Sequence, residues 1–162
     1  MTKNIKVPIS LFESPNFVTD KHQKSINLAK TIWQNLLKFP IFKTSLKQID
    51  HLVKTHKPDI ILNFYDVLGG IYNALYRPKC QFWVIGHQYL IHHPDFPFAP
   101  RQPLQKLLFK TNTHITSLGA DMLLALSFRP MKAHNIKNLL VLPPLLRKEV
   151  INLKSTEGGF FL

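Results

Sequence analysis

The sequence of 162 residues lacks several features, and each absence excludes a class of protein. Cys80 is the single cysteine, which excludes a disulfide framework and a cysteine-based zinc site, and we expect a reducing cytoplasm. No stretch approaches the roughly 18 uninterrupted apolar residues that a membrane-spanning helix needs. Residues 1–8 contain two lysines, but no hydrophobic core follows them, so we expect no secretory signal.

Acidic residues are also scarce. Nine Asp and Glu stand against 21 Lys and Arg, which gives a net charge of +12. Such a field favours nucleic acid, a phosphorylated ligand or an anionic membrane surface as partner. The basic residues are scattered singly, without an arginine-rich arm or an aromatic–basic ribonucleoprotein motif, and this disfavours nucleic acid. A basic surface that meets membrane lipid or a phosphosugar fits the charge at least as well.

The pattern of apolar residues predicts an α/β fold. Hydrophobic residues make up 45% of the chain, enough for one domain with a core. Strand-length apolar runs alternate with helical periodicity, which predicts a Rossmann-like open parallel sheet flanked by helices. The predicted strands are 5–12, 59–63, 81–86, 122–128 and 138–142. The predicted helices begin at Thr19 or Asp20, near Phe42, at residue 67 (ending at 76) and at Pro103, and Pro40 separates the first two. We assign Trp33, Phe82, Phe109 and Phe128 to the core.

Polar residues follow the two central strands where each ends. Asn63 and Asp66 come after the first, beside the pair Gly69 and Gly70 that opens a helical pattern. Ligands of open parallel sheets bind just past the carboxyl ends of the strands, and a helix N-terminus with glycines admits an anionic group closely. Two interpretations of Asp66 are open: it orients a histidine or accepts a hydrogen bond from a substrate hydroxyl, or it merely caps the helix.

Histidines follow the second strand. His87 and Gln88 end it. His87 is placed to act as a general base or to bind a sugar hydroxyl, and a structural role, which is the commoner one for a single histidine, is the open alternative. A long loop over 87–100 also carries His92 and His93, and loops of this length in compact domains are usually functional. We expect no metal here, because adjacent histidines rarely reach one ion and no HExxH spacing occurs. The chain also has no Walker lysine motif, no GxGxxG and no GxSxG elbow.

Four segments together resemble a bacterial glycosyltransferase family of the two-domain GT-B type. They are Ile61 to Gly70, Ile85 to Leu90, Ala125 to Pro130 and Leu142 to Val150. The chain is distantly similar to the cell-wall N-acetylglucosaminyltransferase that acts on a lipid-linked acceptor, and the similarity covers most of residues 7–162. In that family the N-terminal domain binds the acceptor, the C-terminal domain binds the nucleotide-sugar donor, and transfer is typically metal-independent.

The resemblance implies that Asn63 and Asp66 line the cleft and that His87 and Gln88 face the acceptor. Together with the residue patterns above, it leads to the following expected roles. His87 and Asp66 are the expected catalytic pair. Substrate-binding residues are expected at Asn63, Gly69, Gly70, Gln88, His92 and His93. We expect no cofactor, with a nucleotide sugar as co-substrate and a sugar or lipid-linked molecule as acceptor. A cytoplasmic location, with a basic surface suited to contact at the inner membrane face, fits these partners.

Two departures from the family pattern lead us to expect an incomplete protein. Nothing ahead of Ile5 matches the family's first strand and its glycine- and histidine-bearing loop, and the chain ends at Gly158 to Leu162, where a strand of the donor domain is expected to begin. We therefore predict a partial acceptor-binding domain over 1–146, followed by 147–162 as interdomain linker and start of a missing donor domain. Such a fragment is expected to lack turnover.

Two other functions remain open. The first is a basic α/β module that binds nucleic acid or a partner without catalysis. The second is a small stand-alone enzyme that uses His87 and Asp66 on a phosphorylated metabolite.

Overall fold

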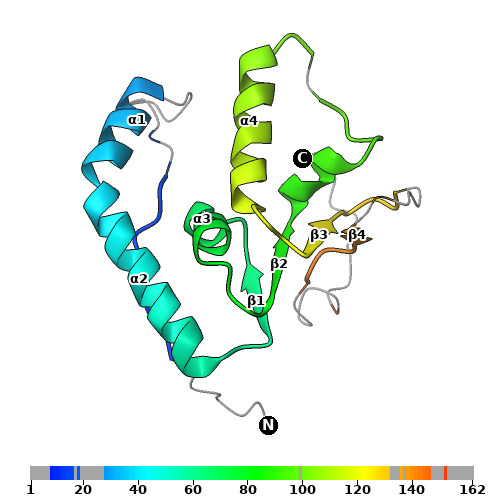
Figure 1. Cartoon of the computed structure of the whole chain (residues 1–162). Helices are drawn as coiled ribbons and strands as arrows, with labels where there is room; N and C mark the ends of the chain where they lie inside the picture. The colour runs from blue at the N-terminus through cyan, green and yellow to red at the C-terminus, as the bar shows by residue number, and fades with distance from the viewer. Residues whose placement is uncertain are drawn as a thin grey trace.

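A computed structural model of the chain describes residues 8–16, 18, 28–98, 100–131, 136, 138–146 and 152 (Figure 1). Its elements are the helices α1 (Leu28–Leu37), α2 (Phe39–His56), α3 (Val67–Tyr76) and α4 (Pro103–Thr116), the 3-10 helix η1 (His87–His92), and the strands β1 (Ile60–Asn63), β2 (Gln81–Gly86), β3 (Met122–Leu126) and β4 (Leu139–Leu142). The Thr19 or Asp20 cap and most of the predicted linker at 147–162 lie outside the described residues.

The strands form one parallel sheet in the order β1-β2-β3-β4, so the predicted Rossmann-like α/β class is confirmed. Asn63 pairs with Val84, and Val84 pairs with Leu123. Because every strand runs in the same direction, the chain leaves β1, β2 and β3 at the same edge of the sheet. That edge carries the polar residues which follow β1 and β2.

One face of the sheet carries the core. Phe82, Val84, Tyr89 and Ala125 are its buried members, and side chains of β1, β3 and β4 pack against them. Right-handed crossovers between strands added in one direction place their helices on one face, and α3 and α4 pack against each other there. The other face is exposed at the edge strands, at Leu62 of β1 and Leu140 of β4. The described sheet is therefore covered unevenly.

The boundaries of several elements agree with the sequence-based prediction. The helix at 67–76 and the strand at 81–86 are confirmed residue by residue, and Pro103 starts α4 as expected. The break near Pro40 is confirmed too, but it falls at Lys38, and Pro40 lies in the first turn of α2, where its missing N–H breaks no helical bond. β3 ends at Leu126, two residues before the predicted end at 128.

Three structural predictions are wrong. Residues 8–12 form no strand; they belong to a coil segment whose continuation, 13–16 with Val18, hydrogen-bonds to α1 through side chains. Trp33 and Phe128 are exposed instead of lying in the core, whereas Phe82 is buried as predicted. The cause for Trp33 is that α1 turns its polar side to this coil segment, a contact that periodicity does not reveal.

Candidate functional site

The candidate site lies at the carboxyl edge of the sheet, beyond the ends of β1 and β2. Asp66 follows β1 as the N-cap of α3, and His87 follows β2 directly as the first residue of η1. The segment 87–100 was predicted as a long loop, but its first part is this 3-10 helix. Tyr89 on η1 is completely buried, so η1 is anchored on the core and holds the residues around it in place.

Asn63 is the buried centre of this edge. Its side-chain Nδ2 donates to the carbonyl of Asp66 at 2.9 Å and to the carbonyl of Thr116 at 2.9 Å. Its Oδ1 accepts a hydrogen bond from the backbone N–H of Asp66 at 3.0 Å. The residue is only 5% exposed. Asn63 therefore fixes the turn before α3 to the end of α4, and both of its amide hydrogens are already used within the protein.

The contacts of Asp66, Gly69 and Gly70 give each of these residues a structural role. The Asp66 Oδ1 accepts a hydrogen bond from the N–H of Gly69 at 3.0 Å, which is the capping role. A Cβ at Gly69 would lie 2.9 Å from the Asn63 side chain, and one at Gly70 would overlap the carbonyl oxygen of Ile115. The glycines thus permit close packing of α3 on β1 and α4. Asp66 is exposed, and its cap uses one of the two carboxylate oxygens.

His87 and Gln88 differ in exposure. The His87 side chain is exposed at the carboxyl edge, and Gln88 is half-buried. The Gln88 amide folds back over Gly86, where an added Cβ would meet its Oε1 at 2.7 Å. Both Asp66 and His87 are described, and no hydrogen bond or ion pair joins them. The structure brings the two to one edge of the sheet without such a bond between them.

The two histidines at the end of η1 have different environments. His93 is 3% exposed, and its Nδ1 accepts a hydrogen bond from the backbone N–H of Asp95 at 3.2 Å, which closes the turn after η1. His92 is on the surface. Its partial burial lowers the pKa of His92 below the ordinary value, and His114 and Lys110 on α4 lower it further. A neutral His92 can accept a hydrogen bond from a ligand, whereas a ligand cannot reach His93 without displacing the turn.

A network of tyrosines and threonines supports this edge, and the sequence analysis missed it. The Tyr89 hydroxyl donates to Thr116 Oγ1 at 3.1 Å, and the hydroxyls of Tyr65 and Thr113 are 2.9 Å apart. The two tyrosine rings meet edge to face with centroids 5.6 Å apart. Each tyrosine lies two or three residues past a strand end, which is the only sequence feature that points to it. The network fixes η1 and the turn before α3 to the end of α4.

Burial of this network predicts a loss of stability at alkaline pH. Burial raises the pKa of Tyr89 to about 12, from 10.0 in the unfolded chain. The unfolded state therefore releases this proton first, and stability falls as the pH rises from 10 towards 12. In Tyr89→Phe, we expect the stability deficit relative to wild type to shrink by about 1.4 kcal/mol between pH 8 and pH 11. Urea unfolding at both pH values measures it, and a constant deficit would contradict the expectation.

A second hollow lies at the opposite, amino-terminal edge of the sheet. It is a cavity of about 940 Å³. Its lining includes Lys54 and Lys57 from the end of α2, Arg77 and Lys79 after α3, and the partly buried Cys80. The ends of α2 and α3 both point here, and basic side chains near helix C-termini commonly offset the helix dipole. The sequence analysis assigned no role to these residues.

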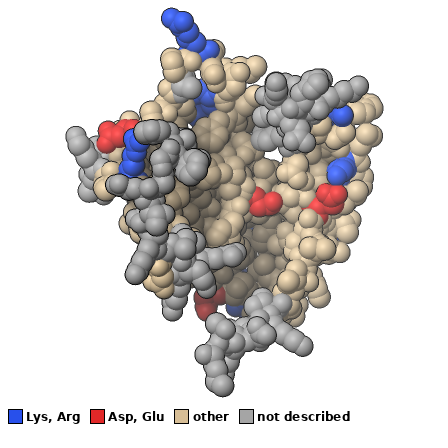
Figure 2. Space-filling view, turned by 180° about the vertical axis from the view of Figure 1, so that it is seen from behind, with Lys and Arg blue, Asp and Glu red and all other residues tan. Residues whose placement is uncertain are grey.

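Other classes of site are not seen in the described part of the chain. No group of three or more His, Cys, Asp or Glu side chains lies close enough there to hold a metal ion. No described helix is long and apolar enough to cross a membrane. On the face shown in Figure 2, the described Lys and Arg side chains stand apart from one another, with no continuous basic track of the kind that follows a nucleic-acid backbone.

Comparison with protein families decides between the remaining classes. The model of glycosyl transferase family 1 matches residues 4–162, nearly the whole chain. The chain belongs to glycosyl transferase family 1. No curated protein and no solved structure matches it.

Membership of family 1 agrees with the fold. The family supports a GT-B-type glycosyltransferase, and the four-stranded parallel sheet flanked by helices is consistent with part of a GT-B domain. Glycosyl transfer is therefore the class of chemistry to which this family 1 chain belongs. Ligands of open parallel sheets generally bind at the carboxyl edge, and in this chain that edge carries Asp66 and His87.

Proposed function

We propose that this chain is the acceptor-binding part of a glycosyltransferase that moves a sugar from a nucleotide-sugar donor to a hydroxyl acceptor. The observation that carries the proposal is the match to glycosyl transferase family 1 over residues 4–162. The acceptor is a sugar or a lipid-linked sugar, in line with the resemblance to the cell-wall N-acetylglucosaminyltransferase. The donor binds to a second domain of the enzyme, so residues 1–162 alone do not turn over.

The side chains that a ligand can reach at the carboxyl edge take different chemical roles. His87 takes the proton of the acceptor hydroxyl as its oxygen bonds to the anomeric carbon of the donor, and the nucleoside diphosphate leaves with the electron pair of the broken bond. Asp66 keeps its capping bond to Gly69 through Oδ1 and accepts a hydrogen bond from the acceptor with its second oxygen. Gln88 and His92 bind further hydroxyls of the acceptor.

Four members of the predicted site act by holding the backbone in position. Asn63, Gly69, Gly70 and His93 make contacts within the protein that set the turn before α3 and the turn after η1. We propose that they shape the acceptor site and do not touch the acceptor. Asn63 is the clearest case, because both of its amide hydrogens are bonded to backbone carbonyls.

Binding of simple glycosides tests the proposal. The chain labelled with ¹⁵N is titrated with methyl β-N-acetylglucosaminide and methyl β-glucoside at millimolar concentration. We expect weak binding with shift changes confined to 66–69 and 86–92, and a several-fold weaker affinity in His87→Asn and Asp66→Asn. His56→Asn, a change to an exposed histidine at the far end of α2, is the matched control and should bind as wild type does.

Two results would contradict the proposed function. One is tight binding of a uridine-diphosphate sugar to residues 1–162 in an isothermal titration, which would place the donor site on this chain. The other is a set of glycoside-induced shifts at the amino-edge cavity, around Asp59 and Arg77, instead of the carboxyl edge.

A further inference from the structure

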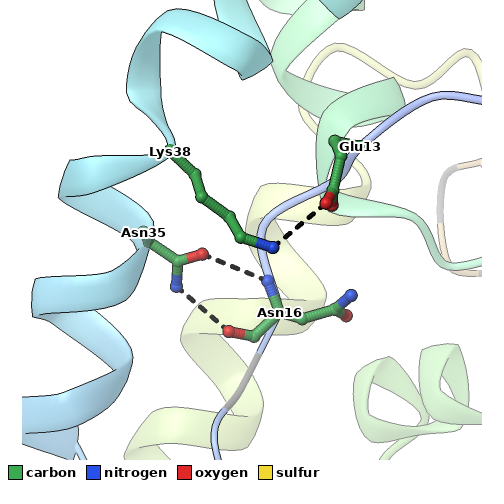
Figure 3. A network of polar contacts seen from close by, with 4 residues as sticks. All are labelled: Glu13, Asn16, Asn35 and Lys38. Atoms are coloured by element: carbon green, nitrogen blue, oxygen red, sulfur yellow. Dashed lines mark hydrogen bonds and ion pairs between the residues drawn. The ribbon is translucent and has the colours of Figure 1, made fainter.

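Helix α1 contacts the rest of the protein with its polar side. Thr31, which is buried, hydrogen-bonds through Oγ1 with the backbone N–H of Val18 at 2.9 Å. One turn on, the Asn35 amide bonds with both backbone groups of Asn16, at 3.0 Å and 3.3 Å (Figure 3). The next turn places Lys38 in an ion pair with Glu13 at 3.1 Å. These residues follow a spacing of three or four, so they occupy one side of the helix.

The opposite side of α1 is apolar and exposed. Four large apolar residues alternate in the sequence with Thr31, Asn35 and Lys38 and are all exposed: Ile32, Trp33, Leu36 and Leu37. Trp33, for example, is 64% exposed. Phe39 and Ile41, just past the break, are exposed as well. An ordinary surface helix buries its apolar stripe and exposes its polar side. Here the arrangement is reversed, and α1 and α2 run along one flank of the molecule (Figure 1).

The charge of the two helices that carry this stripe is mainly positive. Residues 28–56 contain five lysines and one acidic residue, Asp50. That carboxylate is paired with Lys54 at 2.7 Å. Lys43 and Lys47, on the first turns of α2 after the stripe, are exposed. An exposed apolar stripe with Trp, Phe and Leu beside lysines is the composition of helices that lie in the boundary between lipid headgroups and acyl chains.

We propose that this flank is a docking surface for an anionic lipid bilayer. We define the α1–α2 surface as Ile32, Trp33, Leu36, Leu37, Phe39 and Ile41 together with Lys43 and Lys47. The apolar members enter the boundary between headgroups and acyl chains, and the two lysines contact lipid phosphates. The inference goes beyond the proposed function, because it concerns a surface on α1 and α2 and not the carboxyl edge of the sheet.

The composition of the α1–α2 surface disfavours two other partners, a second copy of the chain and nucleic acid. A symmetric contact between two copies through this surface would bring Lys43 and Lys47 of both chains to one interface, with Asp50 already paired. Nucleic acid would leave the apolar stripe without a partner, because phosphates contact only the lysines. Anionic lipid offers both an apolar phase and phosphates at the required depth.

Co-sedimentation with vesicles tests the proposal. The full chain is mixed with vesicles of phosphatidylcholine alone and with vesicles that also contain phosphatidylglycerol. We expect binding to the anionic vesicles and a shift of Trp33 emission to shorter wavelength, followed in a Trp83→Phe background. Trp33→Ser with Leu36→Ser should abolish binding. Lys43→Gln with Lys47→Gln should weaken it about fivefold for each lysine removed.

A matched control and the contrary outcomes make the test decisive. Leu104→Ser with Leu107→Ser changes two leucines of α4 that are 52% and 60% exposed, and it should leave vesicle binding unchanged. Circular dichroism checks that each variant folds. The proposal fails if anionic vesicles do not bind, if the Trp33 and Leu36 pair leaves binding intact, or if light scattering shows a dimer that this pair dissociates while vesicles bind nothing. Glycoside binding is measured separately, so failure here leaves the acceptor role standing.

Discussion

Asn63→Asp is expected to lower the free energy of unfolding by about 3 kcal/mol or more at pH 8, because the exchange removes donors from buried carbonyls. The wild-type amide donates to the carbonyls of Asp66 and Thr116. A carboxylate has the same shape but offers no hydrogen, so three negative or partly negative oxygens would face each other away from water. For a chain of this size the melting midpoint would fall by about 10 °C.

The pH dependence of this variant identifies the cause. Burial raises the pKa of a carboxyl group above its ordinary value, so the protonated form favours the folded state and the stabilisation disappears as the pH rises. We therefore expect Asn63→Asp to be less damaging near pH 4 than at pH 8. The matched control is Asn35→Ala, which removes an amide that also bonds twice to backbone, but through hydrogen bonds that are exposed to solvent. It should cost no more than about 1 kcal/mol. If Asn63→Asp is as stable as the wild-type protein at pH 8, the structural role of the Asn63 amide is contradicted.

Gly70→Ala is expected to destabilise the protein by about 2 kcal/mol, although alanine in a helix usually gains about 1 kcal/mol over glycine. A Cβ at Gly70 would overlap the carbonyl oxygen of Ile115 and lie 2.9 Å from Thr116 Cα. The obstructing atoms belong to the backbone of α4, so α3 must move away from its neighbour. Urea unfolding followed by circular dichroism gives the change.

Position within α3 supplies the control for the glycine prediction. Leu75→Ala, on the exposed side of the same helix, should change stability by less than about 0.5 kcal/mol. A larger side chain at position 70, as in Gly70→Val, should prevent the native fold from forming, so that urea produces no cooperative unfolding transition. If Gly70→Ala is instead more stable than wild type, α3 and α4 do not approach each other as closely as the structure has them.

The sheet could be predicted from the sequence because its strands are short apolar runs with residues at both ends that interrupt the apolar pattern. The strand at 81–86 lies between Lys79-Cys80 and His87, and the helix from Pro103 begins with a residue that suits a first turn. Local chemistry determined these boundaries. The end of β3 was placed two residues too late because Phe128 is apolar, although the chain leaves the sheet before it.

The sequence-based prediction failed where the exposure of a residue depends on how its helix is oriented in the folded protein. Periodicity showed that α1 has an apolar stripe, but it does not show which side meets the protein, and Thr31 and Asn35 meet it instead. At the candidate site the sequence predicted that Asn63, Asp66 and His87 lie at one edge of the sheet, and the parallel strands place them there. It could not separate exposed residues such as His87 from those engaged inside the protein such as His93, because burial depends on the path of a 3-10 helix that was predicted as loop.

The order of the strands in the sheet has a consequence for how the protein is made. Each described strand from β2 to β4 pairs with the strand that precedes it in the chain. Each of β2, β3 and β4 therefore finds its partner already in place as it emerges from the ribosome, so pairing among the described strands follows the order of synthesis. Folding can proceed in the direction of synthesis, and because chain growth takes seconds, each βα unit has time to dock before the next appears.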